Sequence, residues 1–187
     1  NSNPSGHPLT VVINSIGNSL YMRIAWQIVG NDIADFNSCV RLMTYGDDNC
    51  IGIKSGCNFN HTLIRRALAT LGINYTMADK SAISVPLISI GEVDFLKRKF
   101  VQSEFGILAP LSVDSIVRML CFKYDTKMDA LNHNCLVLED GFVEAWFHGP
   151  IFYEKYLALF NEIRSVHDLE EYIKVFPFDH WTKVLSD

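Results

Sequence analysis

The sequence lacks three features that would each assign it to a class of protein: long apolar runs, paired cysteines and an excess of basic charge. No stretch of its 187 residues approaches the roughly 20 uninterrupted apolar residues that a membrane-spanning helix requires, and no secretory signal pattern opens it. No transmembrane segment is therefore predicted. The net charge of −5 excludes a uniformly basic surface for phosphates, and only Lys97, Arg98 and Lys99 form a local basic cluster.

The cysteines are odd in number and include no Cys-x-x-Cys pair, which argues against a disulfide framework and against a zinc site. Most of them stand among apolar neighbours, where thiols are inert. The sequence therefore predicts reduced thiols, buried or half-buried, at five positions: Cys39, Cys50, Cys57, Cys121 and Cys135.

The sequence does contain enough apolar material for a core, since 49% of its residues are hydrophobic and 20% are charged. This length allows one compact domain or two small ones. After a turn-rich opening segment, apolar residues recur at three- and four-residue steps and predict a long amphipathic helix that ends near Gly30-Asn31: Leu9, Val12, Ile13, Ile16, Leu20, Ile24 and Ile28.

A hairpin and a second helix are predicted next. Residues 39–45 and 50–54 are short β-prone runs, separated by the acidic tip Gly46-Asp47-Asp48-Asn49. Residues 60–71 return to helical spacing, and Gly72 stands where a C-terminal cap belongs.

The remainder of the chain changes character near residue 105. Residues 85–100 predict short strands that turn around Gly91-Glu92, whereas the periodicity after Pro110 is helical. The predicted architecture is therefore α+β, with a mixed part over residues 1–105 and a helical part over 106–187. Breaks between the later helices are expected at Asp125, Asn132, Gly149-Pro150, His167-Asp168 and Pro177.

The acidic tip is the first candidate for chemistry. Two adjacent carboxylates repel each other unless a cation, a basic partner or water relieves them, so Asp47 and Asp48 could bind a divalent metal. Gly-Asp and Asp-Asn pairs are also ordinary hairpin-turn sequences, because Asp and Asn tolerate left-handed backbone. The tetrapeptide alone leaves both interpretations open.

Several segments taken in order resemble the palm of RNA-dependent RNA polymerases from picornavirus-like viruses. Ser5-Gly6, then Thr10 and then Asn14 match the nucleotide-selecting motif of that family, and Tyr45-Gly46-Asp47-Asp48 matches its metal motif. Residues 72–81 resemble the next palm motif, and Phe95-Leu96-Lys97-Arg98 resembles the hairpin between palm and thumb. The later helices resemble the thumb only in character and position.

The resemblance implies a right-hand polymerase fold and assigns roles to matched positions. Ser5, Gly6, Thr10 and Asn14 would bind the incoming nucleotide, with Asn14 bonding the ribose 2′-hydroxyl. Asp47 and Asp48 would be ligands of two Mg²⁺ ions, for which Mn²⁺ could substitute. Lys80 would act as general acid for pyrophosphate, and Lys97 and Arg98 would contact RNA phosphates.

The resemblance begins inside the nucleotide-selecting motif. The fingers and the other metal-binding aspartate of the family are not matched, so a catalytically inactive fragment of a polyprotein product is expected. Implied partners are template and primer RNA, nucleoside triphosphates, a protein primer and other viral replication proteins, at membrane-associated complexes in the host cytoplasm. A reverse transcriptase palm and a non-catalytic RNA-binding module remain the alternatives.

Overall fold

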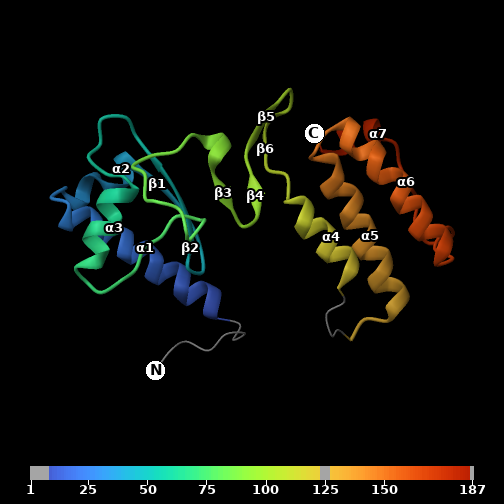
Figure 1. The fold of residues 1–187 in the computed structure, drawn as a ribbon, viewed down its shortest axis with the longest axis horizontal. Helices are drawn as coiled ribbons and strands as arrows, with labels where there is room; N and C mark the ends of the chain where they lie inside the picture. The colour runs from blue at the N-terminus through green and yellow to red at the C-terminus, as the bar shows by residue number, and fades with distance from the viewer. Residues whose placement is uncertain (1–8, 123–126, 186–187) are drawn as a thin grey trace. The chain divides into compact units, whose positions relative to one another are not determined.

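The structure is a computed structural model that describes residues 9–122 and 127–185. The chain divides into two compact units, residues 1–96 and 97–187. Within the described residues, no helix is both long and apolar enough to cross a membrane. The elements are helices and short antiparallel strands, so the prediction of an α+β chain is confirmed at that level (Figure 1).

The first unit is organised around the long helix α1, Thr10–Ile28. The helix ends as predicted: Gly30 has φ +97°, and the amide of Asn31 donates to the carbonyl of Trp26 at 3.2 Å. This pairing, with the Gly30 amide bonded to Gln27, is a Schellman motif. Helix α1 packs against the hairpin β1–β2 and against α3.

The apolar stripe that predicted this helix does not face the core. The buried face carries Asn18, Met22, Ala25 and Trp26. A helix that is apolar on most sides offers no single stripe to select, and the largest side chain, Trp26, decides the orientation. The seven predicted residues are instead 38–58% exposed: Leu9, Val12, Ile13, Ile16, Leu20, Ile24 and Ile28.

The hairpin strands are β1, Val40–Tyr45, and β2, Asp48–Ile53, in an antiparallel register that pairs Tyr45 with Asp48. A short 3-10 helix η1, Ile33–Asp35, and helix α2, Phe36–Cys39, precede them. Helix α3, His61–Ala69, follows, with Asn60 as its N-cap. Gly72, at φ +74°, lies beyond its end as predicted. The core that these elements share consists of Met22, Ala25, Trp26, Phe36, Val40, Phe59, Ile64, Ala67 and Leu68.

The cysteine prediction is wrong for one pair. Cys39 at the end of α2 and Cys57 after β2 form a disulfide. The sequence did not reveal it, because the hairpin between them brings together residues 18 positions apart. Cys50 and Cys135 are half-buried, which raises the pKa of both thiols, and Cys121 is exposed.

The last part of the first unit contains the 3-10 helix η2, Ile90–Glu92, and strand β3, Asp94–Phe95. The turn predicted at Gly91-Glu92 is therefore a helical turn, closed by a capping box in which Ser89 and Glu92 bond each other. Left-handed backbone occurs later, at Leu96 with φ +56° and Lys97 with φ +63°.

The second unit begins with short strands, β4 (Arg98–Lys99), β5 (Val101–Ser103) and β6 (Gly106–Leu108). Its helices are α4, Val113–Cys121; α5, Ala130–Trp146; α6, Pro150–Val166; and α7, Phe178–Leu185. Helix α5 packs against α4 and α6, and α7 contacts both α5 and α6 (Figure 1). The core residues are Leu138, Phe142, Ala145, Trp146, Tyr153, Phe160, Leu169 and Ile173.

Most predicted helix breaks are confirmed. Gly149, at φ +88°, precedes Pro150 at the start of α6, Asp168 has φ +53° after α6, and Pro177 precedes α7. Asn132 does not break a helix, because it lies in the first turn of α5, where its amide donates to the capping carboxylate of Asp129. The break predicted at Asp125 lies outside the described residues.

Candidate active site

The acidic tip is a tight turn between β1 and β2. Only Gly46 and Asp47 lie between the strands, so the turn is shorter than the four residues predicted, and Asp48 and Asn49 belong to β2. Gly46 has φ +63°, and a glycine with positive φ at the first central position is typical of a type II′ turn. Asp47 and Asp48 are consecutive in the sequence, and both residues are exposed to solvent.

Asn18 of α1 holds the backbone of this turn. Its side-chain amide lies 2.8 Å from the carbonyl oxygen of Asp47, 3.2 Å from that of Asp48 and 3.4 Å from that of Gly46. Ser15, one turn earlier on the helix, accepts a 2.8 Å hydrogen bond from the Gly46 amide. Asn18 is only 7% exposed, so these bonds fix the turn against the helix where water does not compete.

The hydrogen bonds continue from Asn18 into the segment after α3. The Asn49 side-chain amide donates to Asn18 Oδ1 at 2.9 Å, and the Tyr75 hydroxyl donates to Asn49 Oδ1 at 2.7 Å. Burial raises the pKa of Tyr75 to about 12. The Tyr75 ring also stacks on His61, with centroids 4.9 Å apart. We call Ser15, Asn18, Asn49 and Tyr75 the turn frame.

Two of the predicted nucleotide-selecting residues lie on α1, the helix that also carries Ser15 and Asn18 of the turn frame. Thr10 and Asn14 are half-buried in α1, and Thr10, Asn14 and Asn18 follow one another at four-residue steps. Residues so spaced share one helix face, so Asn14 lies about one turn, or about 6 Å along the axis, from Asn18. Ser5 and Gly6 lie outside the described residues.

Lys80 occupies an exposed turn beyond Tyr75. Asp79 shapes this turn, because its carboxylate accepts bonds from the amide and the hydroxyl of Ser81, which lower the pKa of Asp79. Lys80 thus follows the Tyr75 segment along the chain, with its ammonium in solvent.

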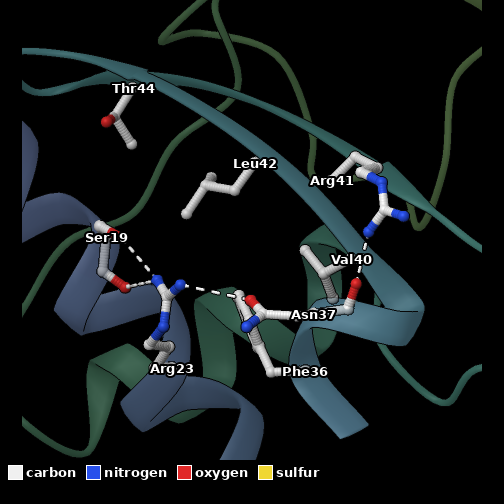
Figure 2. Close-up of a pocket in the computed structure, with 8 residues that line it drawn as sticks. All are labelled: Ser19, Arg23, Phe36, Asn37, Val40, Arg41, Leu42 and Thr44. Carbon is white, nitrogen blue, oxygen red and sulfur yellow. Dashed lines mark hydrogen bonds between the residues drawn. The ribbon is translucent and has the colours of Figure 1, made fainter.

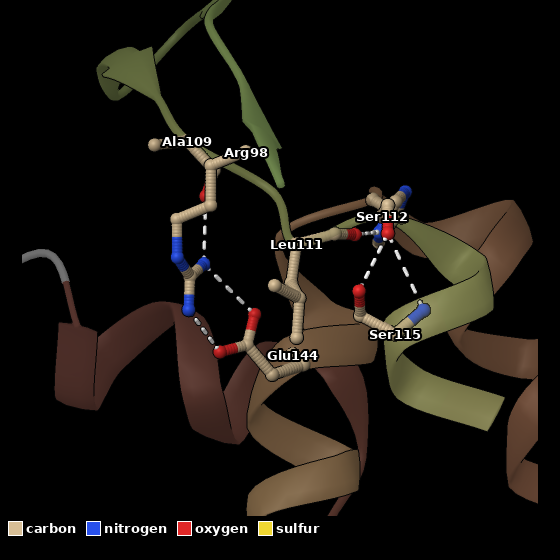
Figure 3. Close-up of polar contacts among 7 residues, drawn as sticks. Arg98, Ala109, Leu111, Ser112, Ser115 and Glu144 are labelled. Atoms are coloured by element: carbon tan, nitrogen blue, oxygen red, sulfur yellow. Dashed lines mark hydrogen bonds and ion pairs between the residues drawn. The ribbon is translucent and has the colours of Figure 1, made fainter. Parts of the chain in front are cut away.

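Lys97 and Arg98 differ in their surroundings. Arg98 is held within the second unit by a bidentate ion pair with Glu144 of α5, at 2.5 and 3.0 Å, and by the carbonyl of Ala109 at 2.8 Å (Figure 3). Lys97 is exposed, and its carbonyl accepts a bond from the Ser112 amide. Only some of the N–H donors of the Arg98 guanidinium therefore remain for a bound ligand, whereas the Lys97 ammonium faces solvent.

The two carboxylates fit part of a metal site. Among the described residues, no hydrogen bond or ion pair engages the side chain of Asp47 or Asp48, while their backbone is fixed. Magnesium in proteins is commonly bound by one or two carboxylates together with substrate phosphates. Within that same part of the chain, no group of three His, Cys, Asp or Glu side chains is arranged to hold a metal ion. The turn therefore offers two ligands of a larger set.

The turn frame was largely missed by sequence reasoning. The sequence motifs assign no individual role to Asn18 or Tyr75, and they include Asn49 only as part of the acidic tip. One signal was present: Asn18 continues the four-residue series of Thr10 and Asn14 on an otherwise apolar helix. Such a residue on a buried face needs a hydrogen-bonding partner.

Comparison with known proteins identifies the family. The family model for viral RNA-dependent RNA polymerase matches residues 1–163. The chain is 33% identical over 165 residues, 82% of its length, to the replicase polyprotein of Cricket paralysis virus. It is 34% identical to the RNA1 polyprotein of Grapevine fanleaf virus over 85% of its length, and 29% identical to the replicase polyprotein of Drosophila C virus over 96%.

These relatives are much longer, and the chain spans only 9%, 7% and 11% of them, respectively. The reverse transcriptase alternative gains no support, because the family model that matches is that of viral RNA-dependent RNA polymerase. The match covers the acidic turn, the turn frame and most of both compact units. The chain belongs to the viral RNA-dependent RNA polymerase family.

Proposed function

We propose that this chain forms the palm, over residues 1–105, and the thumb, over 106–187, of a polymerase that transfers nucleotides from nucleoside triphosphates to an RNA 3′-hydroxyl under the direction of an RNA template. The observation that carries the proposal is the turn frame, which joins the helix of Asn14, the Asp47-Asp48 turn and the Tyr75 segment into one hydrogen-bonded unit. A helix-backed hairpin and a helical bundle suit palm and thumb, and the fingers would come from outside these residues.

Asp47 and Asp48 would hold Mg²⁺, or Mn²⁺ in its place, in a site for two ions. When bound, such ions favour ionisation of the primer 3′-hydroxyl and stabilise charge on the phosphates. The chain's own contribution is positional: Asn18 and Ser15 fix the turn backbone, so the carboxylates need little reorganisation before they bind.

Asn14 would select ribonucleotides. Its amide can both donate to and accept from a ribose 2′-hydroxyl, which a deoxyribose lacks. Thr10, on the same helix face, would lie beside the same sugar, and Ser5 and Gly6, which lie outside the described residues, would also bind the nucleotide.

Lys80 would supply a proton and positive charge to the departing pyrophosphate. Its exposed turn follows the segment that contains Tyr75 and is shaped by the bonds of Ser81 to Asp79, so the ammonium is available to phosphates in solution. We propose that Lys97 contacts RNA phosphates directly, and that Arg98 contacts them with the donors left free by Glu144.

We further propose that the chain acts only as part of a longer polypeptide. Two carboxylates are too few for a two-ion site, so the chain alone should not incorporate nucleotides. Template and primer RNA would be its partners, together with a protein primer and other replication proteins, at membrane-associated complexes in the host cytoplasm.

The test is Asp47→Asn in a polymerase that carries this sequence, with nucleotide incorporation and RNA binding measured separately. Loss of a metal ligand should lower incorporation by orders of magnitude and leave RNA binding intact. The matched control is Asp35→Asn, the same change at an exposed aspartate remote from the turn in sequence. Incorporation near the wild-type rate would show that Asp47 is no ligand and would favour a non-catalytic RNA-binding module.

A second measurement tests Asn14. The Asn14→Ala polymerase should lose much of its preference for ribonucleotides over deoxyribonucleotides while retaining incorporation. An unchanged ratio would remove Asn14 from sugar selection without affecting the proposal for Asp47.

A further inference from the structure

A pocket of about 300 Å³ lies beside β1, apart from the carboxylates of the acidic turn. Its walls come from the C-terminal half of α1, from α2 and from β1 (Figure 2). This volume is at the lower end of the range for small-molecule sites. The lining residues are Ser19, Arg23, Phe36, Asn37, Val40, Arg41, Leu42 and Thr44.

The charge of this lining is positive and uncompensated. Arg23 donates to the carbonyl and the hydroxyl of Ser19 at 3.1 and 2.5 Å and to Asn37 Oδ1 at 3.5 Å, and Arg41 donates to the Asn37 carbonyl (Figure 2). All these acceptors are neutral. Among the described residues, no carboxylate forms an ion pair with either guanidinium, and no Asp or Glu lines the pocket.

The two arginines are held in place and still have donors to spare. Phe36, 2% exposed, lies beneath the Arg23 guanidinium at 4.6 Å from ring centroid to Cζ. Each guanidinium carries five N–H groups, and the bonds above use three on Arg23 and one on Arg41. Asn37 bonds both side chains and so links them. Little conformational entropy remains to be lost when an anion binds.

We propose that this pocket binds a phosphoryl group of a small ligand, either free phosphate or the phosphate of a mononucleotide. Planar guanidinium forks match the oxygen atoms of phosphate, and the positive charge of two arginines without carboxylate partners favours an anion over a neutral ligand. The hydroxyls of Ser19 and Thr44 add two neutral groups to the lining. Neither Asp47 nor Asp48 lines the pocket, so a test of phosphate binding there is independent of a test of the proposed catalysis.

The experiment is calorimetric titration of the chain with inorganic phosphate, adenosine monophosphate and adenosine. Saturable binding of phosphate is expected with a dissociation constant on the order of 1 mM or below. Tighter binding of the monophosphate than of phosphate would identify a nucleotide ligand, and equal binding would identify free phosphate. Adenosine should not bind. Adenosine that binds as tightly as its monophosphate would overturn the proposal.

The variants are Arg41→Gln and Arg23→Gln, each expected to weaken phosphate binding about tenfold through loss of charge-assisted hydrogen bonds. The matched control is Arg65→Gln, the same charge change at an exposed position of α3 that does not line the pocket. Circular dichroism checks the fold, and if Arg23→Gln unfolds, the exposed Arg41 decides the outcome. An equal loss in Arg65→Gln, or no loss in Arg41→Gln, would refute the site.

Discussion

Replacement of Asn18 tests whether the turn frame holds the acidic turn. Asn18→Ala removes the two shorter bonds to the Asp47 and Asp48 carbonyls and leaves the Asn49 amide without its acceptor. A typical hydrogen bond contributes about 1 kcal/mol, and a buried polar group left without a partner costs about 1–3 kcal/mol. The free energy of unfolding should therefore fall by about 2–4 kcal/mol, measured by urea denaturation of the chain.

Two companion variants sharpen this test. Asn18→Asp keeps the shape of the side chain but places an acceptor, charged when ionised, against carbonyl oxygens, so it should destabilise the chain more than Asn18→Ala. Asn74→Ala is the control, since Asn74 is exposed in the same unit. A loss below about 1 kcal/mol for Asn18→Ala, or a milder effect for Asn18→Asp, would refute the reasoning.

Three further outcomes are expected. A double-mutant cycle on Arg98→Ala and Glu144→Ala should give a coupling energy of about 1 kcal/mol, because the pair is bidentate but Arg98 is one-third exposed; a coupling near zero would contradict this. Gly46→Ala should cost about 1–2 kcal/mol in urea denaturation through its positive φ alone, since nothing lies within 4 Å of an added Cβ; Gly46→Asn should cost less, and the reverse order would be inconsistent with a purely conformational cost. Tyr75 ionises at pH 10 when unfolded and near pH 12 when folded, so its stabilisation is complete below pH 10 and disappears as the pH rises to 12; the wild type should lose about 2–3 kcal/mol more than Tyr75→Phe over that range, and parallel curves would exclude a buried Tyr75 hydroxyl.

The local elements of the fold were predictable because their signals lie in neighbouring residues. The Gly30 cap of α1, the Gly72 cap of α3 and the Gly149-Pro150 break each depend on backbone preferences within one turn of chain. The buried face of α1 was not predictable from apolar spacing, because Trp26 and the exposed Ile16 are both apolar and only tertiary packing distinguishes them.

The same distinction applies to the candidate site. Asp47 and Asp48 could be identified from a short motif. The backbone of their turn, however, is fixed by hydrogen bonds from residues about 30 positions away, such as the bond from Asn18 to the Asp48 carbonyl. The ion pair of Arg98 with Glu144 joins residues 46 positions apart. It engages donors of Arg98 that the sequence alone assigns to RNA phosphates. Long-range pairs of this kind leave no periodic trace in a single sequence.

The turn frame contacts the acidic turn only through backbone atoms. Asn18 bonds carbonyl oxygens and Ser15 bonds an amide, so neither depends on the side chains at positions 47 and 48. The shape of the turn is therefore independent of the two side chains at its tip and depends on Asn18 instead. A substitution at position 47 or 48 should change the chemistry of the turn without changing its backbone, whereas a substitution at position 18 should do the reverse.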